Sequence, residues 1–154
     1  MASIMYEKVF SNFLGEVSDI KFASLEEYEM MEILQEHLHR ALAESYLRRC
    51  FSSLTLDDDD QMLRYSLKHE VDADTDEEFV INAAAKMMVY KWWANKVNNI
   101  TLAAQALVGA EQKFYSQANH LTEMRAARDS ALAEAQGFIR DRNAMFNSHL
   151  DGNK

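Results

Sequence analysis

The sequence predicts an all-α, or mainly α, protein: one domain built as a bundle of three to four long helices. Three observations carry this prediction. The chain of 154 residues has no proline and four glycines, so few positions oblige it to turn. Apolar residues recur at spacings of three and four, the period of a helix packed on one side. A chain of this length buries enough surface to fold without a disulfide, and its lone cysteine, Cys50, is expected to be a buried structural thiol.

The first long helix is expected at about 24–50. Before it, residues 3–14 mix apolar and polar positions and fit a short helix or an arm. Ser24 and Glu27 then form a capping box, in which each side chain satisfies a backbone amide of the first turn. The apolar stripe that follows consists of Leu25, Tyr28, Met31, Leu34, Leu38, Leu42 and Tyr46.

Residues 51–74 interrupt the helical pattern and predict a short hairpin or an ordered loop inserted between helices. Two short β-tolerant runs lie at 51–56 and 62–67. Between them stand four aspartates: Asp57, Asp58, Asp59 and Asp60. From Asp57 to Glu78 there are ten acidic residues and two basic ones, so this segment is a distinct acidic element.

The second long helix begins at another capping box, formed by Thr75 and Glu78, and is expected to be the most buried. Its apolar positions cover more than half of its circumference, which is typical of a central helix. Asn98 and Asn99 are expected to end it. A separate short helix is expected at about 102–108.

The third long helix is expected from an N-cap at Ser116 to about Asn147, followed by a flexible tail at about 148–154. Its apolar stripe repeats every seven residues, at Met124, Ala131, Phe138 and Met145. Arginines border the stripe: Arg125, Arg128, Arg140 and Arg142. These arginines are suited to pairing with the acidic segment of a neighbouring subunit. The whole chain, residues 1–154, is expected to be one helical domain.

Charge and motif content argue against several functional classes. The formal net charge of -9 disfavours unassisted nucleic-acid binding, which depends on lysine and arginine contacts to phosphates. We find no Gly-x-Ser-x-Gly elbow and no glycine-rich phosphate loop. Glu36 and His39 form the only Glu-x-x-His pair, whereas a carboxylate-bridged di-iron site in a bundle needs two. We therefore expect no enzymatic activity, metal or cofactor, and no membrane span.

Three segments carry a resemblance to a known family. They are Phe22-Ala23-Ser24-Leu25-Glu26-Glu27, the run from Thr75 to Phe79 that leads into Met87-Met88-Val89-Tyr90-Lys91-Trp92-Trp93, and Lys113-Phe114-Tyr115-Ser116-Gln117-Ala118-Asn119-His120-Leu121. In these segments, which span most of residues 20–140, the chain resembles the head-to-tail connector, or adaptor, proteins of tailed bacteriophages. It departs from the family's pattern in its four-aspartate run, and where Ala94-Asn95-Lys96 stands in place of a proline soon after the tryptophan.

The resemblance implies a structural virion protein in the neck between capsid and tail, made in the cytoplasm of a bacterial host. It implies a homo-oligomeric, dodecameric ring that contacts the portal protein and the next neck or tail-completion protein, with DNA passing through without specific binding. The candidates for the interface or for portal docking are Trp92, Phe114, Tyr115, Arg140, Arg142, Met145 and Phe146. The candidates for lining the DNA tunnel are Asp57, Asp58, Asp59 and Asp60.

Two alternatives stay open at this point. Trp92 and Trp93 lie about 100° apart on a helix, so either one faces a partner or both belong to the core. The alternative function is an acidic inhibitor that mimics DNA and occupies a host nucleic-acid-binding protein, although such mimicry needs carboxylates spread along a face. Presence of the chain in phage particles would discriminate between the two functions.

Overall fold

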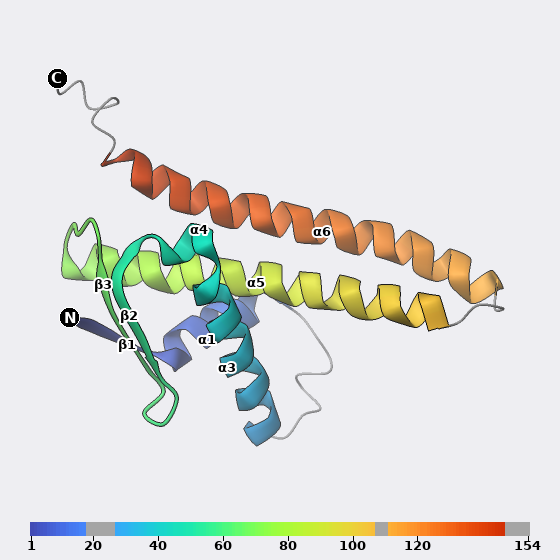
Figure 1. Cartoon of the computed structure of the whole chain (residues 1–154), viewed down its shortest axis with the longest axis horizontal. Helices are drawn as coiled ribbons and strands as arrows, with labels where there is room; N and C mark the ends of the chain where they lie inside the picture. The colour runs from blue at the N-terminus through green and yellow to red at the C-terminus, as the bar shows by residue number, and fades with distance from the viewer. Residues whose placement is uncertain (18–26, 107–110, 147–154) are drawn as a thin grey trace.

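The structure is a computed structural model, and it describes residues 1–17, 27–106 and 111–146. Within them the chain forms three strands and five helices. In chain order they are β1 (Ala2–Met5), α1 (Tyr6–Glu16), α3 (Glu27–Ala43), α4 (Ser45–Arg48), β2 (Phe51–Asp57), β3 (Met62–Leu67), α5 (Ala73–Ala106) and α6 (Glu111–Ala144). Figure 1 shows α5 and α6 as a long antiparallel pair, with the sheet at the end where α5 begins and α6 ends.

The predicted bundle of three to four long helices is wrong, because the chain also builds a three-stranded antiparallel sheet in the order β1-β3-β2. β1 is the strand that the sequence pattern missed, since it lies where a short helix or an arm was expected. In the structure Ile4 of β1 lies opposite Leu63 of β3, and both side chains are buried. A strand this short is stable only because it pairs with a strand far along the chain. The periodicity of the local sequence does not reveal such a partner.

β2 and β3 form an antiparallel hairpin within the segment expected to hold a hairpin or an ordered loop. Its register runs from Phe51 opposite Leu67 at the base to Asp57 opposite Met62 at the turn. Every second residue of β3 is buried, so one face of the sheet packs on the core. At the turn Gln61 has a φ of 53°, an uncommon conformation for a residue with a side chain. The hairpin therefore has a base beside α4 and a turn that carries the aspartates.

The helix expected at about 24–50 is broken at Glu44. α3 ends at Ala43, Glu44 has an extended backbone with a ψ of 124°, and the single turn of α4 follows. The ammonium of Lys91, on α5, donates to the Glu44 carboxylate at 2.6 Å, which ties this break to the central helix. The capping serine expected at Ser24 lies outside the described residues.

α1 and α3 supply much of the core that packs against α5. The buried side chains of α1 are Tyr6, Val9, Phe10 and Phe13. Three members of the predicted stripe of α3 are buried as expected: Leu34, Leu38 and Leu42. Fully burying a large apolar side chain stabilises a fold by roughly 1.5–3 kcal/mol. These two helices therefore fix the sheet and α5 in place.

α5 starts earlier than its capping box predicted. Asp72 is its N-cap, because the Asp72 carboxylate accepts from the Thr75 backbone amide at 2.7 Å and from the Thr75 hydroxyl at 2.9 Å. These bonds hold the pKa of Asp72 below its ordinary value. The expected box of Thr75 and Glu78 is wrong by one turn, since Thr75 already lies inside the helix.

α5 also continues further than expected. Asn98 and Asn99 do not end it, and residues 102–106 of the expected short helix are its last turns. An asparagine inside a helix costs only about 0.5–0.7 kcal/mol relative to alanine, and tertiary packing overrides a penalty of that size. The remainder of that expected short helix lies outside the described residues.

α6 runs back along α5, as Figure 1 shows. It begins at Glu111, so Ser116 lies within it and is not an N-cap. Near the start of α5 and the end of α6, Phe138 stacks on Phe79, with ring centroids 5.8 Å apart. The predicted seven-residue stripe fails at its end, however, because Met145 is exposed. The two long helices therefore pack closely between their ends.

The tail expected at about 148–154 lies outside the described residues. Across the parts of the chain that the structure describes, no helix combines the length and the apolar character needed to cross a membrane.

Candidate functional site

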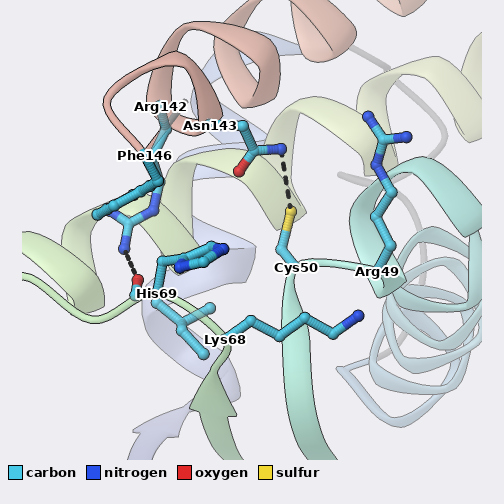
Figure 2. A pocket seen from close by; sticks show the side chains of 8 residues that line it. Arg49, Cys50, Lys68, His69, Arg142, Asn143 and Phe146 are labelled. Carbon is cyan, nitrogen blue, oxygen red and sulfur yellow. Dashed lines mark hydrogen bonds between the residues drawn. The ribbon is translucent and has the colours of Figure 1, made fainter. Parts of the chain in front are cut away.

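A pocket lies at the base of the β2–β3 hairpin, below the C-terminal end of α6. It is a cavity of about 240 Å³. The residues that line it are Arg49, Cys50, Leu67, Lys68, His69, Arg142, Asn143 and Phe146. Figure 2 shows Arg49 and Lys68 on one side and His69, Arg142 and Phe146 on the other. The end of α4, both strand ends and the last turn of α6 thus meet at one place.

The lining of this pocket is basic although the chain is acidic. Two arginines, a lysine and a histidine contribute to it, and none of the described residues that line it carries a carboxylate. The Arg49 guanidinium lies over the Tyr46 ring, 4.2 Å from its centroid, which covers one face of the cation. Lys68 is exposed, and its backbone amide donates to the Cys50 carbonyl at 2.9 Å. The pocket therefore suits a negatively charged group.

Cys50 stands at the back of the pocket and is buried, as the sequence predicted. The Asn143 side-chain amide donates to its Sγ at 3.9 Å, and Figure 2 marks this contact. Burial raises the pKa of the Cys50 thiol, although Asn143 and the surrounding cations act in the opposite direction. Because the thiolate is the reactive form, Cys50 is a poor nucleophile here and fills a structural position.

Arg142 locks the end of α6 onto the start of α5. Its guanidinium donates to the Asp76 carboxylate at 2.9 Å and to the His69 carbonyl at 2.7 Å. It also lies over the Phe79 ring, 4.4 Å from the centroid. The Asp76 carboxylate accepts in addition from the Val71 backbone amide at 3.1 Å. Arg142, predicted as a docking residue, is therefore engaged within its own chain.

The other docking candidates near the end of α6 lie in different surroundings. Phe146 stacks on the His69 ring, with centroids 4.8 Å apart and planes inclined by 15°. Met145 is 56% exposed, and Arg140 is exposed as well. The structure thus brings Arg142 and Phe146 together on His69 and leaves Met145 and Arg140 directed to the outside.

Trp92 lies apart from this group, on the middle of α5. Its side chain is 5% exposed and packs edge-on against Trp93, with ring centroids 4.7 Å apart. The Lys96 ammonium lies over the Trp92 ring at 4.2 Å from its centroid. The sequence left open whether Trp92 faces a partner or lies in the core, and its burial places it in the core. The candidates Phe114 and Tyr115 fall in the first part of α6, where side chains lie outside the described residues.

The four tunnel candidates sit at the hairpin turn, and most of them have partners in the chain. Arg64 pairs with Asp57 at 2.9 Å and lies 3.7 Å from Asp60. The hydrogen bond from Arg64, followed by one from the Asp60 backbone amide, lowers the pKa of Asp57. Asp59 is exposed, and no partner for its carboxylate is found among residues 1–17, 27–106 and 111–146.

Asp58 is held by two side chains from other elements. The Tyr6 hydroxyl donates to Oδ1 at 2.7 Å, and the His39 Nε2 lies 2.9 Å from the same carboxylate. Burial is the largest single influence on the pKa of Asp58 and raises it, but the bonds from Tyr6 and His39 outweigh it, so the net shift is downward. Asp58 therefore braces the turn against α1 and α3, which leaves Asp59 and Asp60 as its most outward carboxylates.

Sequence reasoning did not single out Arg49 and Lys68. A usable signal was present, because Arg49 stands two residues before the first β-tolerant run and Lys68 directly follows the second. Pairing those runs as a hairpin brings their outer ends together. Asp76 and His69 carried no such signal, since their partner Arg142 is far away in the sequence.

In the part of the chain that the structure describes, no group of three or more histidine, cysteine, aspartate or glutamate side chains is placed to hold a metal ion. Comparison of the chain with known protein families, with curated proteins and with solved structures found no match.

Proposed function

We propose that the chain is the head-to-tail adaptor of a tailed bacteriophage, a structural virion protein that forms a homo-oligomeric ring beneath the portal in the neck. The observation that carries this proposal is the fixed seating of the α6 end against the start of α5. Arg142 and Asp76 form an ion pair in which the side chains are 9% and 10% exposed. Beside this anchor, Met145 and Arg140 face outward.

A rigid anchor with an outward apolar side chain is suited to docking. Interfaces derive most of their affinity from a few side chains presented by ordered elements, and methionine adapts to irregular partner surfaces. The Phe146–His69 stack fixes the backbone directly after Met145, so little ordering remains to be done on binding. We therefore assign Met145 and Arg140 to the portal-facing surface, with Arg142 and Phe146 supporting them.

The acidic turn of the hairpin fits the passage of DNA. Asp59 and Asp60 are exposed, and the chain as a whole carries a formal charge of -9. Carboxylates near a moving duplex repel its phosphates and keep it from adhering. In contrast, a DNA mimic needs unpaired carboxylates along a face, while Asp57 is paired with Arg64 and Asp58 is hydrogen-bonded to Tyr6 and His39.

The experiment that tests the proposal is mass spectrometry of gradient-purified particles from the producing host. An adaptor is expected in filled particles and in tail-less heads at a fixed ratio to portal, with equal copy numbers for a dodecameric ring. Absence of the chain from particles, with the protein free in the lysate, would overturn the proposal and favour the acidic-inhibitor alternative.

A binding measurement with purified portal tests the docking surface itself. Met145→Glu is expected to weaken docking, because it places a charge in an apolar contact. Met5→Glu is the matched control, since Met5 is also an exposed methionine but lies on β1 instead of at the end of α6. Equal binding by both variants would remove Met145 from the docking surface.

A further inference from the structure

The two ends of the β2–β3 hairpin carry opposite charge. The pocket at its base presents Arg49 and Lys68, and its turn presents Asp59 and Asp60. The strands between them have seven and six residues, so at about 3.3 Å per residue base and turn are roughly 20 Å apart. In one chain these two sets of charges therefore cannot meet.

Both basic side chains at the base are available to a partner. Neither Arg49 nor Lys68 forms an ion pair with any residue that the structure describes, and both are exposed. Arg142, the third cation of the pocket, is different because it is already paired with Asp76. Arg49 and Lys68 therefore supply the positive charge that can pair with a partner molecule.

The pocket also has room for a carboxylate. Its volume of about 240 Å³ is several times the roughly 30 Å³ that one water molecule occupies in the liquid. Asn143 adds a side-chain amide to the lining, so a hydrogen-bond donor accompanies the two cations. A charged hydrogen bond from Arg49 to a carboxylate is favoured by geometry as well as by charge.

We propose that this pocket receives the hairpin turn of a second copy of this chain, with Arg49 and Lys68 pairing with Asp59 and Asp60 of that copy. The two surfaces differ, so the contact is head-to-tail, and a repeated head-to-tail contact closes into a ring when its rotation allows. The inference deepens the proposed function and rests on it for the ring, while the contact itself can be measured on the purified chain.

This pairing differs from the one expected from the sequence, which assigned the arginines of the last helix to a neighbour's acidic segment. Two of those arginines have partners nearby: Arg142 pairs with Asp76, and Arg128 with Asp129 at 3.0 Å. The cations at the hairpin base take their place, and they flank the hairpin that carries the carboxylates they match.

Carbodiimide cross-linking tests the contact, because it joins a carboxylate to an amine without a spacer. Unlabelled and ¹⁵N-labelled full-length chains are mixed, treated and digested, and cross-linked peptides are identified by mass spectrometry. The same reaction is run on particles if they contain the chain. We expect Lys68 joined to Asp59 or Asp60 in mixed-isotope pairs, since the span within one chain is too long for a direct bond.

Asp59→Asn with Asp60→Asn is expected to remove this cross-link. Asp74→Asn with Glu78→Gln is the matched control, because these two exposed acids lie in the first turns of α5 and away from the hairpin turn. It removes the same number of charges and should leave the cross-link in place. Thermal unfolding of each variant checks that the fold is retained.

Mixing two variants separates a specific contact from general charge effects. The base variant Arg49→Gln with Lys68→Gln, and the turn variant Asp59→Asn with Asp60→Asn, should each self-associate roughly tenfold more weakly in sedimentation velocity. Together they hold one intact base and one intact turn, so a mixture should form a heterodimer that grows no further.

The outcomes are distinct from those of the proposed function. If Lys68 is joined to neither aspartate, in solution or in particles, or if both variants associate like the unmodified chain, the inference is overturned, although the chain can still be an adaptor. If the cross-link forms but the chain is absent from particles, the contact stands and the adaptor assignment fails.

Discussion

The guanidinium of Arg142 lies 2.9 Å from the Asp76 carboxylate, although the two residues are 66 positions apart in the sequence. Both side chains are about nine-tenths buried. Removing one member of such a pair leaves the other as an uncompensated buried charge. This contact therefore holds the end of α6 to the start of α5 and shapes the wall of the basic pocket.

Arg142→Ala is expected to lower the free energy of unfolding by about 3–5 kcal/mol, because the Asp76 carboxylate then stays buried without its cation. Urea denaturation followed by circular dichroism measures this loss. Arg140→Ala is the matched control, since Arg140 is an exposed arginine on the same helix, and its substitution should change stability by no more than about 0.5 kcal/mol. Equal effects of both substitutions would show that the pair contributes little.

His37 is expected to make stability depend on pH. Its side chain is 6% exposed, and its Nδ1 has no hydrogen-bond partner in the described parts of the chain. Burial lowers the pKa of His37 below its ordinary value of 6.5. The unfolded chain therefore takes up a proton at a higher pH than the folded chain, and the free energy of unfolding falls as the pH drops from about 7 toward the folded pKa.

His37→Leu should flatten this pH dependence, because leucine has no proton to gain. Urea denaturation at several pH values between neutral and mildly acidic measures the slope. His120→Gln is the control, since the His120 side chain is 70% exposed. A slope that is unchanged in His37→Leu and reduced in His120→Gln would contradict the assignment.

Trp92→Ala is expected to destabilise the fold by about 3–5 kcal/mol, because it leaves a cavity where a buried ring now packs against Trp93. Met145→Ala should change stability by at most about 0.5 kcal/mol, because Met145 is largely exposed. Thermal and chemical denaturation of both variants provide the comparison. The core position of Trp92 would be refuted by a Trp92→Ala variant that folds normally but loses portal binding.

Cys50 is expected to react slowly with iodoacetamide at neutral pH. Burial raises the pKa of its thiol and also shields Sγ, so little accessible thiolate is present. Mass spectrometry of the intact chain counts the adduct directly, because Cys50 is the only cysteine. The urea-unfolded chain serves as the reference and should react much faster. Equal rates in the two states would mean that the thiol is open to solvent.

Local sequence patterns predicted the features that depend on near neighbours. The stripe of Leu34, Leu38 and Leu42 is buried on one face of α3, because the helical period alone decides which side chains share a face. The change from helix to hairpin at residue 51 was predicted for a similar reason, because two β-tolerant runs on either side of a polar turn favour a hairpin. Cys50 was also expected to be buried, and it is.

Predictions failed where several local signals competed. Thr75 with Glu78 and Asp72 with Thr75 are both good capping pairs, and the structure uses the second. Asn98 resembles a helix end, yet α5 passes through it because packing against α6 outweighs a small propensity penalty. A one-turn shift changes little in the local energy, so the sequence pattern could not choose.

The sequence by itself determined a mainly helical chain with an acidic turn, because composition and hydrophobic periodicity are properties of the local sequence. Only the tertiary structure decided that Ile4 pairs with Leu63 in a third strand and that Arg142 is held by Asp76. It also decided that Arg49 and Lys68 share a pocket. The physical reason is that these contacts join segments that are distant in sequence, and their free energy exists only once the whole core has packed.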